Sequence, residues 1–234
     1  WIGNLSANSQ IIKISVSPAV KASFASDTLK AFSYNGNQYG MPMSVENIAW
    51  IQNAKIMGNT CPATLAAALK TIAAYEAKSG VKLVEKISVP GADPYHFYPV
   101  FSGLGGYVFG TNPSGSLNVK DVGLDNPTFR KNQPTINAWN KTGLINSKVD
   151  YGIAKTAFTT GKSPFWITGP WELDAIKALP FKVRITTVPN IVPGLTPVPF
   201  LGAQGGMVTK YAAQHGVQTG ANALVTQLMA SAAY

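Results

Sequence analysis

The stretch Asp93-Pro-Tyr-His-Phe-Tyr-Pro99, which a short apolar run connects to Gly105-Gly-Tyr-Val-Phe-Gly110, crowds an acid, a histidine and aromatic rings between two prolines. Pro94 fixes its own φ angle and disfavours a helical conformation for Asp93. Together these two residues predict the start of a helix, with the carboxylate at the N-cap and the proline at the first helical position. Tyr95, His96 and Tyr98 then lie in the first turn of that helix, beside the carboxylate.

Two interpretations of this cluster follow from its residue types. A carboxylate next to flat amphipathic rings suits a polyhydroxylated ligand, because the acid accepts hydroxyl hydrogen bonds and the rings cover the C–H faces of a sugar. The alternative is a capped helix whose aromatic rings belong to the core. Residue types alone favour the second interpretation.

Upstream, Tyr34-Asn-Gly-Asn-Gln-Tyr39 predicts a β-hairpin, since Asn-Gly between alternating residues is the strongest short hairpin signal. It leads into Gly40–Ile51, which is typical of an extended strand and carries Glu46 as its single acid. A lone acid in a strand is either exposed at a sheet edge or placed for a function, and the sequence leaves both possibilities open.

The rest of the chain alternates between strand and helix patterns. Thr64–Ser79 has apolar residues at helical spacing and Gly80 as its stop, and Gly169-Pro-Trp171 joins a strand directly to a helix start. This alternation predicts an α/β architecture with a largely parallel sheet. Further helices are expected at 127–141, 151–160 and 218–231, strands at 81–89, 163–168, 183–188 and 200–209, a turn at 112–115, and an irregular connector at the proline-rich 189–199.

Composition narrows the functional classes. The chain is 46% hydrophobic, enough to bury a core, but only 12% charged, and the net charge of +9 reflects a shortage of acids. The basic residues are scattered singly, so nucleic-acid binding is not expected. A single cysteine, Cys61, and two distant histidines, His96 and His215, do not predict a metal centre, and no cofactor is expected. The sequence contains no run of eighteen apolar residues, so it predicts no membrane-spanning helix.

Acids and aromatic residues recur at the ends of predicted elements, where open α/β sheets bind ligands. They are Glu46, the Asp93–His96 cluster, Tyr151 and Trp171. Structural roles are possible for each: Trp171 can pack a helix start against a sheet, Tyr151 and His96 can be core, and Asp93 can be only a cap. Trp50, Trp139 and Trp166 lie on apolar faces and are expected in the core.

These residues resemble the extracellular solute-binding proteins of sugar ABC transporters, specifically the maltose/maltodextrin-binding type, from Trp1 to at least Leu228. The Asp93–Pro99 stretch, where better-known relatives have a Glu and a Phe, is most similar to the maltose-binding lipoproteins of actinobacteria. The motifs that carry the resemblance in order are Tyr34–Pro42, Val45-Glu46, Gly105–Phe109, Lys120–Gly123, Gly169–Trp171 and Pro199–Gly202.

The resemblance implies two α/β lobes, joined by hinge strand crossovers near 44–48 and 198–203, that close on an oligosaccharide in the cleft between them. Residues 1–45 and 202–234 would form an incomplete lobe I, and 47–198 lobe II. It further implies capture of maltose or maltooligosaccharides without chemistry, delivery to a membrane ABC permease, a monomer, and a lipid-anchored cell-surface or periplasmic location. The sugar contacts implied by the family pattern are Trp1, Glu46, Asp93, Tyr95, His96, Tyr151 and Trp171.

The chain departs from the family pattern in two respects. Relatives carry an acid shortly after the position of Trp1, and Asn4 is the nearest candidate here. The opening strands of lobe I and the last aromatic platform of the family fall outside 1–234, so the chain is expected to be a piece of a longer protein. Two rival functions stay open: binding of another solute, such as trehalose, another oligosaccharide or a polyol, and glycoside hydrolysis with Glu46 and Asp93 as the carboxylate pair.

Overall fold

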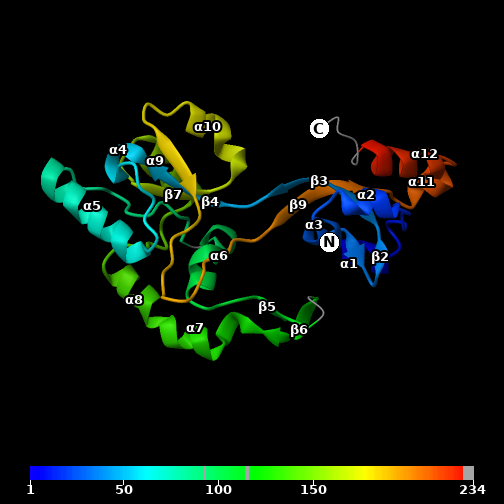
Figure 1. Cartoon of the computed structure of the whole chain (residues 1–234), viewed down its shortest axis with the longest axis horizontal. Coiled ribbons are helices and arrows are strands. Elements are labelled where there is room, and N and C mark those ends of the chain that lie inside the picture. Colours follow the sequence, from blue (N-terminus) through cyan, green and yellow to red (C-terminus); the bar gives the residue numbers. More distant parts are fainter. Residues whose placement is uncertain (92, 114–115, 229–234) are drawn as a thin grey trace. The chain divides into compact units, whose positions relative to one another are not determined.

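The computed structural model describes residues 1–91, 93–113 and 116–228, and the chain divides into two compact units. Unit 1 comprises Trp1–Glu46 and Leu201–Tyr234, and unit 2 comprises Asn47–Phe200 (Figure 1). The chain therefore passes from one unit to the other twice, after Glu46 and after Phe200.

Unit 1 is organised around two long antiparallel strands, β3 (Gly40–Glu46) and β9 (Gly202–Met207), which run side by side in Figure 1. The predicted hairpin is confirmed as β1 (Ser33–Tyr34) and β2 (Asn37–Gln38). Asn35 and Gly36 between them have φ angles of 47° and 74°, the left-handed conformation that this tight turn requires. The helices of the unit are α1 (Ile2–Ala7), α2 (Pro18–Ala22), α3 (Ser26–Lys30), α11 (Tyr211–Gln214) and α12 (Gln218–Ala223), followed by a π-turn over Leu224–Leu228.

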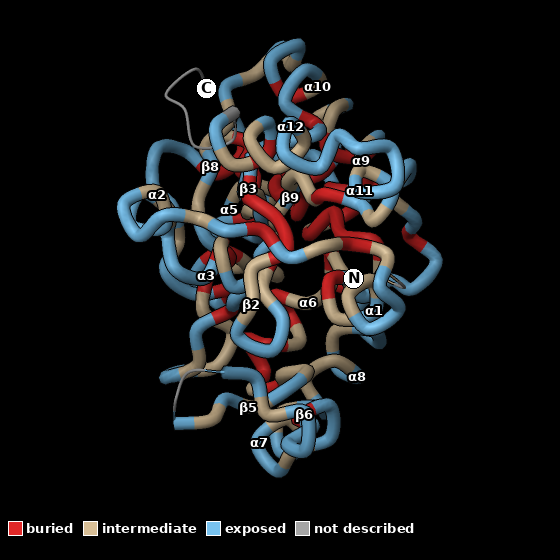
Figure 2. The backbone as a smooth tube through the Cα atoms, turned by 90° about the vertical axis from the view of Figure 1, so that its right-hand side faces the viewer, coloured by how far each residue is buried: buried red, intermediate tan, exposed pale blue. Residues whose placement is uncertain are grey.

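The core of unit 1 is small and consists of two apolar clusters. One joins Ile2, Ile11, Phe32 and Tyr39, and the other joins Ile14, Met41, Val208 and Val225. Helices α2 and α12 bury none of their residues, as the pale tube over α2 in Figure 2 shows.

Unit 2 contains a three-stranded sheet in which β4 (Ala49–Asn53) lies between β7 (Phe165–Thr168) and β8 (Val183–Thr186). Both neighbours pair with β4 in the antiparallel direction, and every strand ladder among the described residues is antiparallel. The expectation of a largely parallel sheet is therefore wrong. The predicted strand–helix–strand connection does exist, because β7 and β8 share one direction and α10 (Leu173–Lys177) lies between them in sequence. However, β4 is inserted between the two strands.

The side chains of this sheet alternate between two apolar clusters, as the pleat of a β-strand dictates. Trp50, Phe165 and Ile167 belong to the larger cluster, whereas Ile51 and Trp166 belong to the second. Both faces are thus covered, which explains why β4 is buried over most of its length. The expected core positions of Trp50 and Trp166 are confirmed.

Helices surround this sheet, and most begin where the sequence predicts. They are α4 (Ala54–Met57), α5 (Leu65–Ser79), α6 (Pro94–Gly103), α7 (Pro127–Asn132), α8 (Pro134–Lys141) and α9 (Tyr151–Thr159), with short 3-10 turns at Gly123–Asp125 and Pro170–Glu172. A hairpin of β5 (Phe109–Thr111) and β6 (Leu117–Val122) completes the unit; Ser114 and Gly115 of its predicted turn lie outside the described residues.

Two predicted elements of unit 2 differ from the structure. The helix expected over 127–141 is two helices, because Pro134 lacks the N–H that would continue the hydrogen-bond ladder through Gln133. The strand expected over 81–89 is an extended segment with a single bridge, from Ser88 to Trp166. Its backbone does not form a continuous ladder, since the Leu83 amide donates to the Glu76 side chain instead.

Candidate functional site

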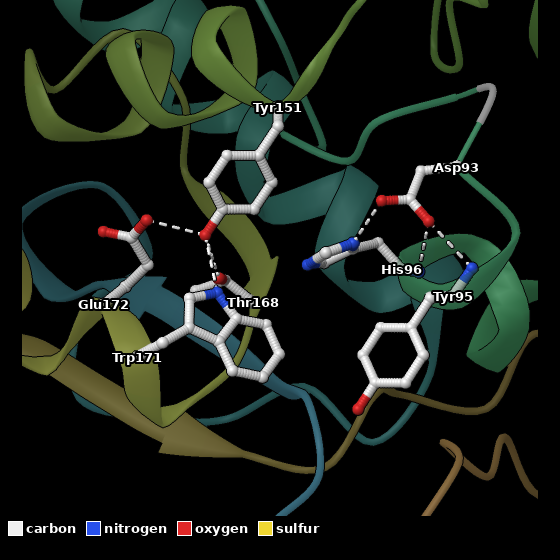
Figure 3. A network of polar contacts seen from close by, with 7 residues as sticks. All are labelled: Asp93, Tyr95, His96, Tyr151, Thr168, Trp171 and Glu172. Atoms are coloured by element: carbon white, nitrogen blue, oxygen red, sulfur yellow. Dashed lines mark hydrogen bonds and ion pairs between the residues drawn. The ribbon is translucent and has the colours of Figure 1, made fainter. Parts of the chain in front are cut away.

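The Asp93 carboxylate caps helix α6 and holds a histidine at the same time (Figure 3). Its Oδ1 accepts hydrogen bonds from the backbone amides of Tyr95 at 2.9 Å and His96 at 3.4 Å, and its Oδ2 lies 2.7 Å from His96 Nδ1. Partial burial opposes ionisation of Asp93, but the hydrogen bonds from His96 and the Tyr95 amide outweigh it and lower the pKa of the carboxyl. Asp93 is therefore an anion with both oxygens engaged.

The His96 ring has one satisfied nitrogen and one without a partner. The residue is only 7% exposed, and its buried Nε2 atom has no hydrogen-bond partner among the described residues. When Nδ1 carries the proton and donates to Asp93, Nε2 of the neutral ring is an acceptor. Figure 3 shows this nitrogen on the side of the ring away from Asp93, toward Tyr151 and Trp171. The atom is buried, so it is an unpaired acceptor inside the aromatic cluster, which a ligand hydroxyl reaches only if a neighbouring ring shifts.

The Tyr151 hydroxyl, at the start of α9, is fully used within the protein. It donates to Glu172 Oε1 at 2.6 Å, accepts from Trp171 Nε1 at 2.7 Å, and lies 3.2 Å from Thr168 Oγ1. A phenol has a single proton, so the Thr168 hydroxyl is the donor in the last of these contacts. Burial, and then the bond to Glu172, raise the pKa of Tyr151. The hydroxyl has no capacity left for a ligand, and only the ring is available.

Glu172 is the site residue that the sequence analysis missed. Its carboxylate is buried. Oε1 accepts a hydrogen bond from the Tyr151 hydroxyl, and Oε2 forms an ion pair with Lys155 Nζ at 2.7 Å. Tyr151 and Lys155 are four residues apart in one helix, so they lie on the same face of α9. That spacing, together with an acid directly after the predicted platform Trp171, is the signal in the sequence that could have identified the group.

Aromatic rings surround these polar groups. Trp171 meets His96 edge to face, with centroids 5.8 Å apart, and is tilted against Tyr95 at 6.2 Å. Phe200, the last residue of unit 2, stacks on Tyr95 at 5.9 Å. Trp171 is 45% exposed, so part of its surface is open to a ligand. Flat rings beside an anion and an unused acceptor form a surface that suits a sugar.

The structure brings together Asp93, Tyr95, His96, Tyr151 and Trp171, all in unit 2, at the start of α6, the start of α9 and the end of β7. The remaining three expected residues, Trp1, Asn4 and Glu46, belong to unit 1. Trp1 is fully exposed at the start of α1, Asn4 has its side chain within 3.4 Å of the Asn8 amide nitrogen, and Glu46 accepts a hydrogen bond from Gln204 at 3.2 Å.

The apolar residues of α9 differ in burial. Ile153 is exposed, whereas Ala157 and Phe158 of the same helix are buried. Ile153 follows Tyr151 by two residues and therefore points away from the face that Tyr151 shares with Lys155.

Residues 1–91, 93–113 and 116–228 contain no group of three or more His, Cys, Asp or Glu side chains that could hold a metal ion. Within the same ranges, none of the helices combines the length and the apolar character needed to cross a membrane.

Comparison with known proteins gives a consistent picture. The model of the family described as bacterial extracellular solute-binding protein matches residues 1–234. The chain is 30% identical over 121 residues to the galactooligosaccharide-binding protein of Bacillus subtilis (strain 168), which is 50% of this chain and 29% of that protein. It is 26% identical over 221 residues to the maltodextrin-binding protein MdxE of the same organism, covering 90% of this chain and 50% of MdxE.

A third relative is the maltooligosaccharide ABC transporter solute-binding lipoprotein of Streptococcus pneumoniae (strain ATCC BAA-255 / R6), 24% identical over 217 residues, 88% of this chain and 49% of that protein. The chain thus spans half or less of the length of these curated relatives. Because the family model matches the whole chain, the protein belongs to the bacterial extracellular solute-binding proteins.

Proposed function

We propose that the protein captures maltose or maltooligosaccharides and delivers them to a membrane ABC importer without chemical change. The observation that carries this proposal is the cluster of Tyr95, His96, Tyr151 and Trp171 beside the Asp93 carboxylate, with an unused acceptor on His96. Rings supply stacking area for the pyranose faces, and the polar atoms supply directional hydrogen bonds.

The relatives support this ligand class and this role. Two of them are named for maltodextrin and maltooligosaccharide, and one is named as a solute-binding lipoprotein of an ABC transporter. From these names we extend a lipid-anchored location and a permease partner to this protein; a periplasmic location is the alternative, and we expect the protein to act as a monomer. Sugar binding would stabilise the conformation of the protein that the permease recognises, because a ligand favours the state to which it binds better.

The electrostatics of the site favour binding over hydrolysis. A glycosidase needs one carboxylic acid that stays protonated near neutral pH and donates to the leaving oxygen. The pKa of Asp93 is lowered, so this group is ionised at neutral pH. Both oxygens of Glu172 are already engaged, Oε1 by the Tyr151 hydroxyl and Oε2 by the Lys155 ammonium group. Neither of these two carboxyls is suited to act as the acid, so hydrolysis would need the acid from Glu46, and the product analysis described below tests that.

Unit 1 would contribute the remaining contacts, from Trp1, Asn4 and Glu46. Within the described residues, the one hydrogen bond of the Glu46 side chain comes from Gln204. A carboxylate can accept several hydrogen bonds, so Glu46 has acceptor capacity left for a sugar. Alanine at Glu46 is expected to weaken sugar binding, whereas alanine at Gln204 should not, and titration of the two variants separates a sugar contact from a structural bond.

The proposal is tested by calorimetric titration of the protein with maltose, maltotriose, trehalose and glucose, followed by analysis of each sugar. Trp171→Ala should weaken maltotriose binding by about 1–3 kcal/mol, because a stacked ring and its buried area are lost. Tyr211→Ala is the matched control, since Tyr211 is an exposed ring in unit 1, at 52%. Unchanged affinity in Trp171→Ala removes Trp171 from the site, and release of glucose or maltose would make the protein an enzyme.

A second candidate ligand has its own support. The galactooligosaccharide-binding relative is 30% identical over half of the chain, so galactooligosaccharides belong in the same titration series. Tighter binding of a galactooligosaccharide than of maltotriose would keep the transport role and change the sugar.

A further inference from the structure

The ion pair between Lys155 and the buried Glu172 is connected through the Tyr151 hydroxyl to Trp171, the proposed sugar platform. The Glu172 side chain is 7% exposed and that of Lys155 is 43% exposed, with 2.7 Å between Nζ and Oε2. Burying a carboxylate is costly unless it is paired and hydrogen-bonded, and here both oxygens have partners. A neutral sugar gives this ion pair no direct role, so its location next to Trp171 needs another explanation.

We infer that Lys155 and Glu172 are positioning residues that fix the indole ring of Trp171 through the Tyr151 hydroxyl, an inference that rests on the proposed sugar-binding function. The chain of contacts begins with the ion pair from Lys155 Nζ to Glu172 Oε2. It continues from Glu172 Oε1 to the Tyr151 hydroxyl at 2.6 Å, and from that hydroxyl to Trp171 Nε1 at 2.7 Å (Figure 3).

Each contact in this chain has only one possible direction. An ionised carboxylate can only accept, so the Tyr151 proton must point to Glu172. The lone pairs of the Tyr151 oxygen are then free to accept from Trp171, whose indole N–H can only donate. If Glu172 were absent, the Tyr151 proton could turn toward Thr168 Oγ1, 3.2 Å away, and the alignment with the indole would be lost.

Trp171 needs such a device because packing alone does not hold it. The residue is 45% exposed and lies in a three-residue 3-10 turn, Pro170–Glu172, rather than in a long helix. Its aromatic neighbours are His96 and Tyr95, at 5.8 Å and 6.2 Å between centroids, and its ring also lies over the backbone of Gly169. A stacking platform must be held in one orientation to contribute fully, since ordering it on binding costs side-chain entropy.

The test is a double-mutant cycle on maltotriose affinity. Glu172→Ala should weaken binding about tenfold in the native background, and less than about twofold in a Trp171→Phe background, because phenylalanine keeps a ring but has no N–H to align. Glu172→Gln should retain most of the affinity, since its amide oxygen still accepts from Tyr151. Glu76→Gln is the matched control, because Glu76 pairs with Lys86 at 3.2 Å in the same unit.

A ligand-free measurement separates this inference from the proposed function. The indole N–H resonance of Trp171, assigned by its loss in Trp171→Phe, should shift in Glu172→Ala and stay in place in Glu76→Gln. If no sugar binds the native protein, the proposed function fails, and the resonance still tests the positioning role. Should Glu172→Ala not fold, Lys155→Met takes its place in the same two measurements, and Glu172→Gln is the variant expected to keep both the affinity and the resonance. An unmoved resonance in the variant that takes the place of Glu172→Ala, or in Glu172→Ala itself, or an equal loss of affinity in both backgrounds, would overturn the inference.

Discussion

Replacing Asp93 by alanine should lower the free energy of unfolding of unit 2 by about 2 kcal/mol, counting its two roles separately. Loss of an N-cap costs about 1 kcal/mol, and Asp93 caps α6 through the Tyr95 and His96 amides. The charge-assisted bond to His96 contributes a further ~1 kcal/mol, at the low end of its class because the Asp93 side chain is 36% exposed.

Asp150→Ala provides the matched control. Asp150 caps α9 through its bond to the Ile153 amide at 2.8 Å, so its loss should cost only about 1 kcal/mol. Asp93→Asn should cost no more than Asp150→Ala, at most about 1 kcal/mol, because its amide oxygen can still cap α6 while the charge is gone. Urea unfolding followed by tryptophan fluorescence measures these differences in unit 2, which contains Trp50, Trp139, Trp166 and Trp171.

The reasoning would be refuted if Asp93→Ala cost no more than Asp150→Ala. In that case the bond to His96 adds nothing to the cap. The ring would then owe its orientation to packing against Tyr95, Tyr151 and Trp171.

Three further predictions concern pH and packing. The pKa of Asp93 lies below its usual value of about 3.9, so the stability that its ionised form contributes is present above that pH and disappears as the pH falls through the lowered pKa. The difference between the unfolding free energies of the native protein and Asp93→Ala, measured from pH 7 downward, should therefore close only below about pH 4. Phe158→Ala should cost about 3–5 kcal/mol by leaving a cavity in the second core cluster, and a loss under 1 kcal/mol in urea unfolding would contradict this packing. Gly36→Ala should destabilise the β1–β2 hairpin by about 1 kcal/mol, because φ is 74° there, whereas Gly152→Ala in helix α9 should be neutral or stabilising; thermal unfolding of both variants compares them.

Local signals in the sequence predicted the parts of the fold that depend on near neighbours. The Asp93-Pro94 cap, the Asn35-Gly36 turn, and the Thr64 and Gly80 boundaries of α5 are each set by one or two side chains acting on adjacent backbone. Such interactions require no knowledge of the rest of the chain.

Features that depend on distant partners could not be predicted in this way. Strand directions are an example, because β4 separates β7 from β8 although α10 connects those two in sequence. The extended segment before Ser88 is another, since the Glu76 side chain takes the Leu83 amide.

The candidate site shows the same division. Residue types identified Asp93, Tyr95, His96, Tyr151 and Trp171, which the structure brings together in unit 2. The role of Glu172 depends on contacts with Tyr151 and Lys155, 21 and 17 residues earlier, that only the folded chain creates.

The pairing of β3 with β9 has a consequence for biosynthesis. Glu46 lies opposite Gly202, so unit 2 is an insertion of about 150 residues between two neighbouring positions of one ladder. Closing a disordered loop of that length costs about 4 kcal/mol of chain entropy, a cost that falls away once the insertion has folded and holds its own ends together. Strand β3 leaves the ribosome before unit 2 but must wait for β9 before their ladder can form, so the inserted unit is expected to fold before these two strands pair.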